Sequence, residues 1–128
     1  MKIVDLLKRE SVELNGKVTS KPEAIEKMVA LMAAGGNLAD VEAYKKGVFA
    51  REEESTTGIG EGIAIPHAKT AAVKAPGLAA MVVKDGVDYD SLDGEPANLI
   101  FLIAAPDTED NVHLEVLSRL SMLLMDPD

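Results

Sequence analysis

The chain has 128 residues, of which 47% are hydrophobic, so its size and composition are those of one compact domain with one core. Its 22 acidic residues outnumber its 13 basic residues and give a formal net charge of −9, and an acidic surface repels nucleic acid and anionic lipid headgroups. Cysteine is absent, which excludes disulfide bonds, thiolate metal sites and thiol nucleophiles.

The first predicted helix covers residues 22–34. Ser20 and Glu23 have the spacing of a capping box, and Pro22 lies between them in the first turn, where proline is tolerated. Gly35 and Gly36 then end the helix. Apolar residues recur at helical spacing, at Ile25, Met28, Val29 and Met32. This periodicity predicts that one face of the helix is buried.

A second predicted helix begins after Asp40, whose side chain can cap the first turn, and it continues into residues 51–55. One face carries an apolar stripe formed by Val41, Tyr44, Val48 and Phe49. We expect the opposite face to contact solvent through Lys45, Lys46, Glu52 and Glu53.

Short β-type runs follow the second helix. They cover residues 59–65, 78–83 and 99–104. The dipeptides Asp85-Gly86 and Asp93-Gly94 predict turns between these runs. This middle part of the chain is therefore interpreted as a small sheet with hairpin-like connections.

The last predicted element is a helix from Asp110 onward, with apolar residues at helical spacing and acidic residues at its N-terminal end. The order of helices, strands and a helix predicts an α/β fold, in which helices cover a small mixed β-sheet within a single domain over residues 1–128. Because the chain stops directly after a strong apolar helix face, we expect that C-terminal residues of the full domain are lacking or that the chain is part of a longer polypeptide.

No segment of the sequence predicts secretion or membrane insertion. The longest apolar run, residues 99–105, is too short to span a bilayer. Charged residues interrupt the N-terminus too often for the hydrophobic region of a signal peptide. We therefore predict a cytoplasmic domain.

Three glycines at alternate positions, Gly58, Gly60 and Gly62, precede a strand-like run. Such glycines let backbone N–H groups turn toward an anion, so a phosphate-binding loop is one interpretation. Their spacing matches neither nucleotide-binding glycine pattern, and a helix precedes them while a strand follows, the reverse of both nucleotide folds. On spacing alone, a simple connecting segment is favoured over a specific site.

His67 follows directly behind Pro66, whose fixed φ removes one backbone freedom and helps to aim the next side chain. A neutral imidazole has a ring nitrogen that can attack phosphorus. The only other histidine, His113, lies at the start of the last predicted helix, where the positive helix end favours a bound anion. Taken alone, each is more often a structural or surface histidine. Two histidines without a third ligand do not make a metal site, so we expect no metal.

The run Ser55 to Ala68, STTGIGEGIAIPHA, closely resembles the phosphorylation-site motif of fructose/mannitol-type enzyme IIA domains of the bacterial phosphoenolpyruvate-dependent sugar phosphotransferase system. The resemblance extends from the first predicted helix through Ala104-Ala105-Pro106 and residues 113–117, and so covers nearly the whole chain. Domains of this family carry further helix where the present chain stops, in agreement with the expectation that C-terminal residues are lacking.

The resemblance implies that His67 accepts a phosphoryl group on Nε2, while Arg51 and His113 line the site and steady the phosphate. Phosphoryl transfer requires in-line positioning and positive groups around the equatorial oxygens, and an arginine supplies a fork of donors with a fixed charge. No cofactor is then expected. The candidates for a phosphate loop are Thr57, Gly58 and Gly60.

The resemblance also implies the partners. In this family HPr donates the phosphoryl group, a cysteine of a IIB domain accepts it, and the domain is tethered in some proteins to a membrane component IIC. An acidic rim suits a positively charged donor surface. Two other interpretations stay open beside the favoured fructose-type carrier: a regulatory IIA protein, of the nitrogen-related branch or attached to a transcription regulator, and an interaction domain without chemistry. The joint presence of His67, Arg51 and His113 counts against the last.

Overall fold

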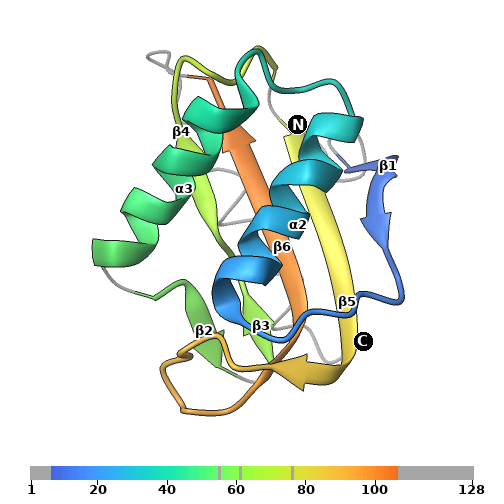
Figure 1. Cartoon of the computed structure of the whole chain (residues 1–128), viewed down its shortest axis with the longest axis vertical. Coiled ribbons are helices and arrows are strands. Elements are labelled where there is room, and N and C mark those ends of the chain that lie inside the picture. Colours follow the sequence, from blue (N-terminus) through green and yellow to red (C-terminus); the bar gives the residue numbers. More distant parts are fainter. Residues whose placement is uncertain (1–6, 55, 61, 76, 107–128) are drawn as a thin grey trace.

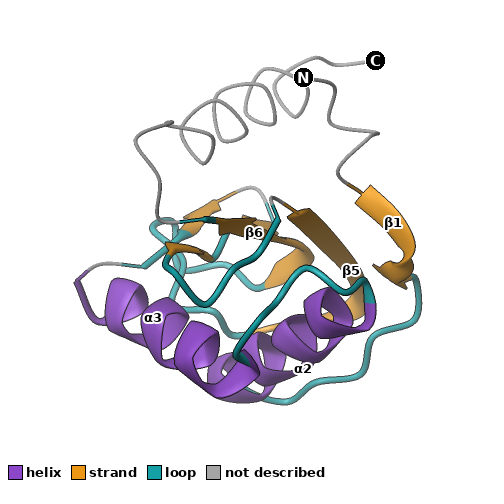
Figure 2. Ribbon diagram, turned by 90° about the horizontal axis from the view of Figure 1, so that it is seen from above, coloured by secondary structure: helices purple, strands orange, loops and turns teal. Residues whose placement is uncertain are grey.

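The computed structural model describes residues 7–54, 56–60, 62–75 and 77–106. These residues form a six-stranded sheet in the order β1-β5-β6-β3-β2, with β4 also paired to β6. Helices α2 (Lys21–Ala34) and α3 (Val41–Glu54) lie side by side on one face of this sheet (Figure 1, Figure 2). The predicted α/β fold with helices covering a mixed sheet is confirmed.

The strands combine parallel and antiparallel pairs. Their bounds are β1 Leu7–Glu13, β2 Gly58–Gly60, β3 Ile63–Ala64, β4 His67–Lys69, β5 Gly77–Val87 and β6 Ala97–Ala105. β5 and β6 are antiparallel, whereas β1 runs parallel to β5. β3 and β4 both run parallel to β6 and pair with successive parts of it, at Leu99–Ile100 and at Ile103–Ala105. The step between them is the dipeptide Ile65-Pro66, which therefore brings His67 beside the end of β6.

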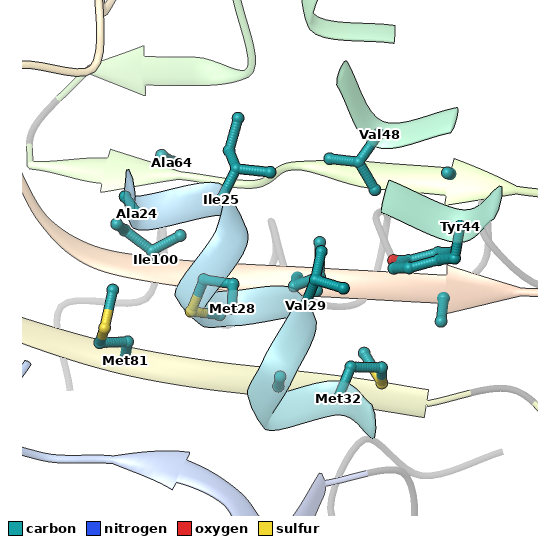
Figure 3. Packing of buried hydrophobic residues seen from close by; sticks show 14 of the residues in the cluster. Ala24, Ile25, Met28, Val29, Met32, Tyr44, Val48, Ala64, Met81 and Ile100 are labelled. Carbon is teal, nitrogen blue, oxygen red and sulfur yellow. The ribbon is translucent and has the colours of Figure 1, made fainter. Parts of the chain in front are cut away.

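Helix α2 has the ends that its sequence predicts. The Ser20 hydroxyl accepts a hydrogen bond from the Glu23 N–H at 3.3 Å, and the Glu23 carboxylate accepts one from the Thr19 N–H at 3.0 Å. Gly35 follows the last turn, and Gly36 adopts a positive φ of 78°. Figure 3 shows the buried face of α2 lying against β5 and β6, formed by Ala24, Ile25, Met28, Val29 and Met32. Burial of each larger side chain contributes about 1.5–3 kcal/mol.

Helix α3 is capped by Asp40, whose carboxylate accepts a hydrogen bond from the Ala43 N–H at 3.1 Å. Tyr44 is fully buried, and its hydroxyl donates to the Ile103 carbonyl oxygen at 2.7 Å. Burial raises the pKa of this phenol. One expectation for α3 was wrong, because Glu52 is buried rather than in solvent. Val41, the first residue of the apolar stripe, is 39% exposed. Glu52 is buried because hydrogen-bond donors surround it, as described below.

Strand β1 was not predicted, because its sequence LKRESVE is rich in charge. It forms one edge of the described sheet, where charged side chains reach solvent, and the Ser11 hydroxyl ties it to the Leu31 carbonyl oxygen of α2 at 2.9 Å. The β5–β6 hairpin is confirmed, with a turn at Asp93-Gly94. The turn predicted at Asp85-Gly86 was wrong, since this dipeptide lies within β5.

Gly86 has a positive φ of 76°, and the β5–β6 register shifts between Val82 and Val87. The dipeptide thus supplies the left-handed residue of an irregular strand instead of a hairpin turn. No helix in the described part of the chain is both long and apolar enough to cross a bilayer. The helix predicted from Asp110, with His113, lies outside the described residues.

Candidate functional site

His67 is the first residue of β4 and is half-buried. The Pro66 carbonyl oxygen before it accepts a hydrogen bond from the Ile103 N–H of β6 at 3.1 Å, which fixes the start of the strand. The Nδ1 atom of His67 lies 3.0 Å from the Ile65 carbonyl oxygen. Because a carbonyl oxygen can only accept, Nδ1 carries the proton of the neutral ring, and the nucleophilic lone pair is on Nε2.

An open depression of about 360 Å³ lies between α3 and β4. Arg51 reaches it from the last turn of α3, and His67 reaches it from β4. The structure therefore brings together two of the three residues that the sequence predicted for the site. The lining residues are Gly47, Ala50, Arg51, Glu54, His67, Ala68 and Lys69.

Two lining residues, Lys69 and Glu54, were not predicted from the sequence. Lys69 lies two residues after His67 on β4, and successive strand residues alternate between faces, so the two side chains share one face while Ala68 is buried. Glu54 lies three residues after Arg51, which is one turn along α3. Both spacings were present in the sequence and could have identified these residues once β4 and α3 were known to be neighbours.

The charges of the depression suit a dianionic group only in part. Arg51 and Lys69 supply two cations near the histidine, whereas the Glu54 carboxylate opposes an incoming anion. The described residues contain no group of three or more His, Asp or Glu side chains that could hold a metal ion.

The phosphate-loop candidates have other contacts in the structure. Thr57 is buried, and both its hydroxyl and its backbone N–H donate to the Glu52 carboxylate. Gly58 lies against Ser91, where an added Cβ would be 2.5 Å from the serine oxygen. Gly60 pairs with Ile63 in the antiparallel β2–β3 pair. None of the three lines the depression between α3 and β4, so their role in phosphate binding stays a prediction, as does that of His113.

Comparison with known proteins identifies the family. Residues 5–128 match the family model described as "Phosphoenolpyruvate-dependent sugar phosphotransferase system, EIIA 2". The chain belongs to this family.

Among curated relatives, the "PTS system fructose-specific EIIABC component" of Bacillus subtilis (strain 168) is 54% identical over 125 residues, which are 98% of this chain. This chain spans only 20% of the length of that protein. The "PTS system fructose-specific EIIA component" of Haloferax volcanii is 40% identical, over 93% of this chain and 77% of its own length.

Solved structures agree with the family. The crystal structure of nitrogen regulatory protein IIA-Ntr from Neisseria meningitidis has a TM-score of 0.84 and 30% identity, covering 96% of this chain and 84% of its own. The mannitol enzyme IIA of Escherichia coli, solved in complex with phosphorylated enzyme IIB, has a TM-score of 0.81 and 28% identity, covering 94% of this chain and 84% of its own.

Proposed function

We propose that this domain is a phosphoryl carrier of a sugar phosphotransferase system, in which Nε2 of His67 takes a phosphoryl group from one protein and passes it to another. The observation that carries the proposal is the 3.0 Å contact between Nδ1 of His67 and the Ile65 carbonyl oxygen. It holds the proton on Nδ1 at the edge of a depression that Arg51 and Lys69 also line.

The transfer step needs no group beyond the two proteins. The Nε2 lone pair of His67 attacks phosphorus, the bond from phosphorus to the donor breaks, and its electron pair leaves with the donor. The ring then carries phosphorus on Nε2 and a proton on Nδ1, so it is positively charged, and the Ile65 carbonyl oxygen stabilises that charge. Arg51 and Lys69 offset the negative charge of the phosphoryl oxygens. Return of the group to an acceptor nucleophile reverses these changes.

The donor in this proposal is HPr and the acceptor is a cysteine of a IIB domain. The acceptor is supported by the complex of the similar Escherichia coli mannitol IIA with phosphorylated IIB. A fructose-type system is favoured because the identity to the Bacillus fructose-specific protein is 54%, against 37% for a nitrogen regulatory protein of Bradyrhizobium. The net charge of −9 suits a donor with a positively charged contact surface.

The regulatory alternative also has support, since the Neisseria nitrogen regulatory protein has a TM-score of 0.84 to this chain. Both candidates use the same phosphohistidine, so they differ only in the recipient. Adding separately purified fructose-type and mannitol-type IIB domains to the phosphorylated protein distinguishes them. Rapid loss of label to a fructose-type IIB supports transport, whereas retention with every sugar-type IIB favours regulation.

The central test is incubation with enzyme I, HPr and labelled phosphoenolpyruvate. The wild-type chain should take up label that is stable in alkali and lost in acid, as expected for a phosphorus–nitrogen bond. The His67→Ala variant should take up none while keeping the circular dichroism spectrum of the wild type, and His113→Ala should still be labelled. Undiminished labelling of His67→Ala would overturn the proposal.

A further inference from the structure

Glu52 is a buried carboxylate beside the candidate site, and its side chain is only 5% exposed. One oxygen, Oε1, accepts from the Thr57 hydroxyl and from the Tyr89 hydroxyl, the latter at 3.1 Å. The other oxygen, Oε2, accepts from the Thr57 N–H at 3.2 Å and contacts the Lys21 ammonium at 2.9 Å. A carboxylate has about four lone-pair positions, so these four donors satisfy it completely.

The four donors come from three separate segments of the fold. Lys21 is the first residue of α2, Thr57 directly precedes β2, and Tyr89 follows β5. The Lys21 ammonium also lies 4.8 Å from the centre of the Tyr89 ring. Burial and, as the second cause, the negative charge of Glu52 raise the pKa of Tyr89, so this phenol stays protonated and donates. Glu52 thus joins the start of α2 to the segments before β2 and after β5.

The hydrogen bonds continue from Thr57 to the candidate nucleophile. The Thr57 carbonyl oxygen accepts from the Ile65 N–H at 2.9 Å. The Ile65 carbonyl oxygen in turn accepts from Nδ1 of His67 at 3.0 Å. Glu52 therefore fixes Thr57 through two donors, Thr57 fixes the backbone of Ile65, and Ile65 fixes the proton on the His67 ring.

We propose that Glu52 is a positioning residue for phosphoryl transfer, acting on His67 through Thr57 and Ile65 and on Arg51 through the last turn of α3, which both residues share. This inference rests on the proposed function of His67. An uncharged side chain at position 52 leaves every reacting group present but loosens the backbone that orients the histidine ring, so the reacting nitrogen is held less accurately. Displacing a reacting group by about 1 Å costs on the order of a hundredfold in rate.

The first experiment compares Glu52→Gln with Glu53→Gln in the full chain. The two changes remove one negative charge each from neighbouring residues of α3, but Glu53 is exposed and serves as the matched control. A glutamine offers one acceptor oxygen in place of two, so its amide nitrogen cannot accept from the donors on one side. The rate of phosphoryl transfer from HPr should fall about ten- to a hundredfold in Glu52→Gln and stay at the wild-type value in Glu53→Gln.

The second readout concerns the ring itself and does not depend on transfer. Nitrogen-15 NMR of the unphosphorylated protein near pH 8 should show His67 with its proton on Nδ1 in the wild type and in Glu53→Gln. In Glu52→Gln the ring should become a mixture of the two tautomers, because the Ile65 carbonyl oxygen is no longer held. An effect on folding alone would lower the melting temperature without changing the tautomer.

Two substitutions at Thr57 test the same series of hydrogen bonds from Glu52 to His67, this time by changing the donor instead of the carboxylate. Thr57→Ser keeps the hydroxyl that donates to Glu52, whereas Thr57→Val has nearly the same shape without it. In the unphosphorylated protein, Thr57→Ser should retain the wild-type tautomer of His67, and Thr57→Val should show the same mixture of tautomers as Glu52→Gln. If Glu52→Gln does not fold, this pair decides the question by the tautomer, which does not depend on phosphate binding.

The inference is overturned if folded Glu52→Gln keeps both the wild-type transfer rate and the wild-type His67 tautomer, or if folded Thr57→Val keeps the wild-type tautomer. A lower melting temperature with an unchanged rate and tautomer overturns it as well, because Glu52 would then only stabilise the fold. Failure of the wild-type chain to accept label refutes the proposed function instead, and the tautomer comparison still tests whether Glu52 positions the ring.

Discussion

The same added methyl group should have opposite effects at two glycines. Gly47 lies in the interior of α3, and a Cβ there would meet only the Ala68 Cβ, at the ordinary contact distance of 3.5 Å. Glycine costs about 1 kcal/mol relative to alanine inside a helix, so Gly47→Ala should raise the free energy of unfolding by about 0.5–1 kcal/mol. At Gly58 a Cβ would lie 2.5 Å from the Ser91 Oγ and 2.9 Å from the Ser91 Cα. Backbone must move there, so Gly58→Ala should lower the free energy of unfolding by about 1–3 kcal/mol.

Urea denaturation followed by circular dichroism measures both changes. The free energy of unfolding should rise in Gly47→Ala and fall in Gly58→Ala, so the two variants should differ from each other by roughly 1.5–4 kcal/mol, the sum of the estimates above. Ser91→Ala removes the nearest atom and leaves the Ser91 Cα, so it should restore Gly58→Ala only in part. A Gly58→Ala variant as stable as the wild type would refute the close contact. Loss of labelling from HPr in folded Gly58→Ala would favour a phosphate-binding role for this glycine. Normal labelling would indicate that glycine is needed at position 58 only for its packing against Ser91.

Three further results are expected. Tyr44→Phe removes the hydroxyl that donates to the Ile103 carbonyl oxygen at 2.7 Å and should lower the free energy of unfolding by about 1–2 kcal/mol. An unchanged urea midpoint would show that this hydrogen bond does not stabilise the fold. Arg51→Ala should slow labelling by roughly ten- to a thousandfold, with Arg51→Lys between it and the wild type, and equal initial rates in all three would exclude Arg51 from the site. The third result concerns pH, because burial raises the pKa of Tyr44 and of Tyr89 in the folded state. The stability that the two protonated phenols contribute is complete below the pKa of an unfolded tyrosine, about 10, and is lost as the pH rises above it. Urea midpoints should therefore fall above about pH 10, less steeply in Tyr44→Phe, and parallel pH profiles would argue against this origin.

Local signals in the sequence were sufficient for the helices and for the hairpin. Ser20 and Asp40 cap α2 and α3 as predicted, because a cap depends only on residues within one turn. The turn at Asp93-Gly94 was found for the same reason. His67 and Arg51 were proposed as neighbours from a family motif, and the packing of α3 on β4 brings them to one depression.

Features that depend on distant partners could not be predicted. Strand β1 is recognisable only from its pairing with β5, since its charges hide the pattern of a strand. Glu52 has the sequence context of an exposed helical glutamate, and its burial depends on Lys21, Thr57 and Tyr89, which lie up to 37 residues away. Lys69 becomes a site residue only once β4 is known to face α3.

The chain contains two tyrosines and no tryptophan, and both tyrosines are fully buried. The tyrosine band in the near-ultraviolet spectrum of the folded protein therefore comes from two side chains in known surroundings. Tyr44 lies at the contact between α3 and β6, and Tyr89 contacts Glu52. In Tyr44→Phe the remaining signal belongs to Tyr89 alone. That variant becomes an unlabelled optical reporter on the neighbourhood of Glu52, and its spectrum can be followed in real time while a phosphoryl donor is added.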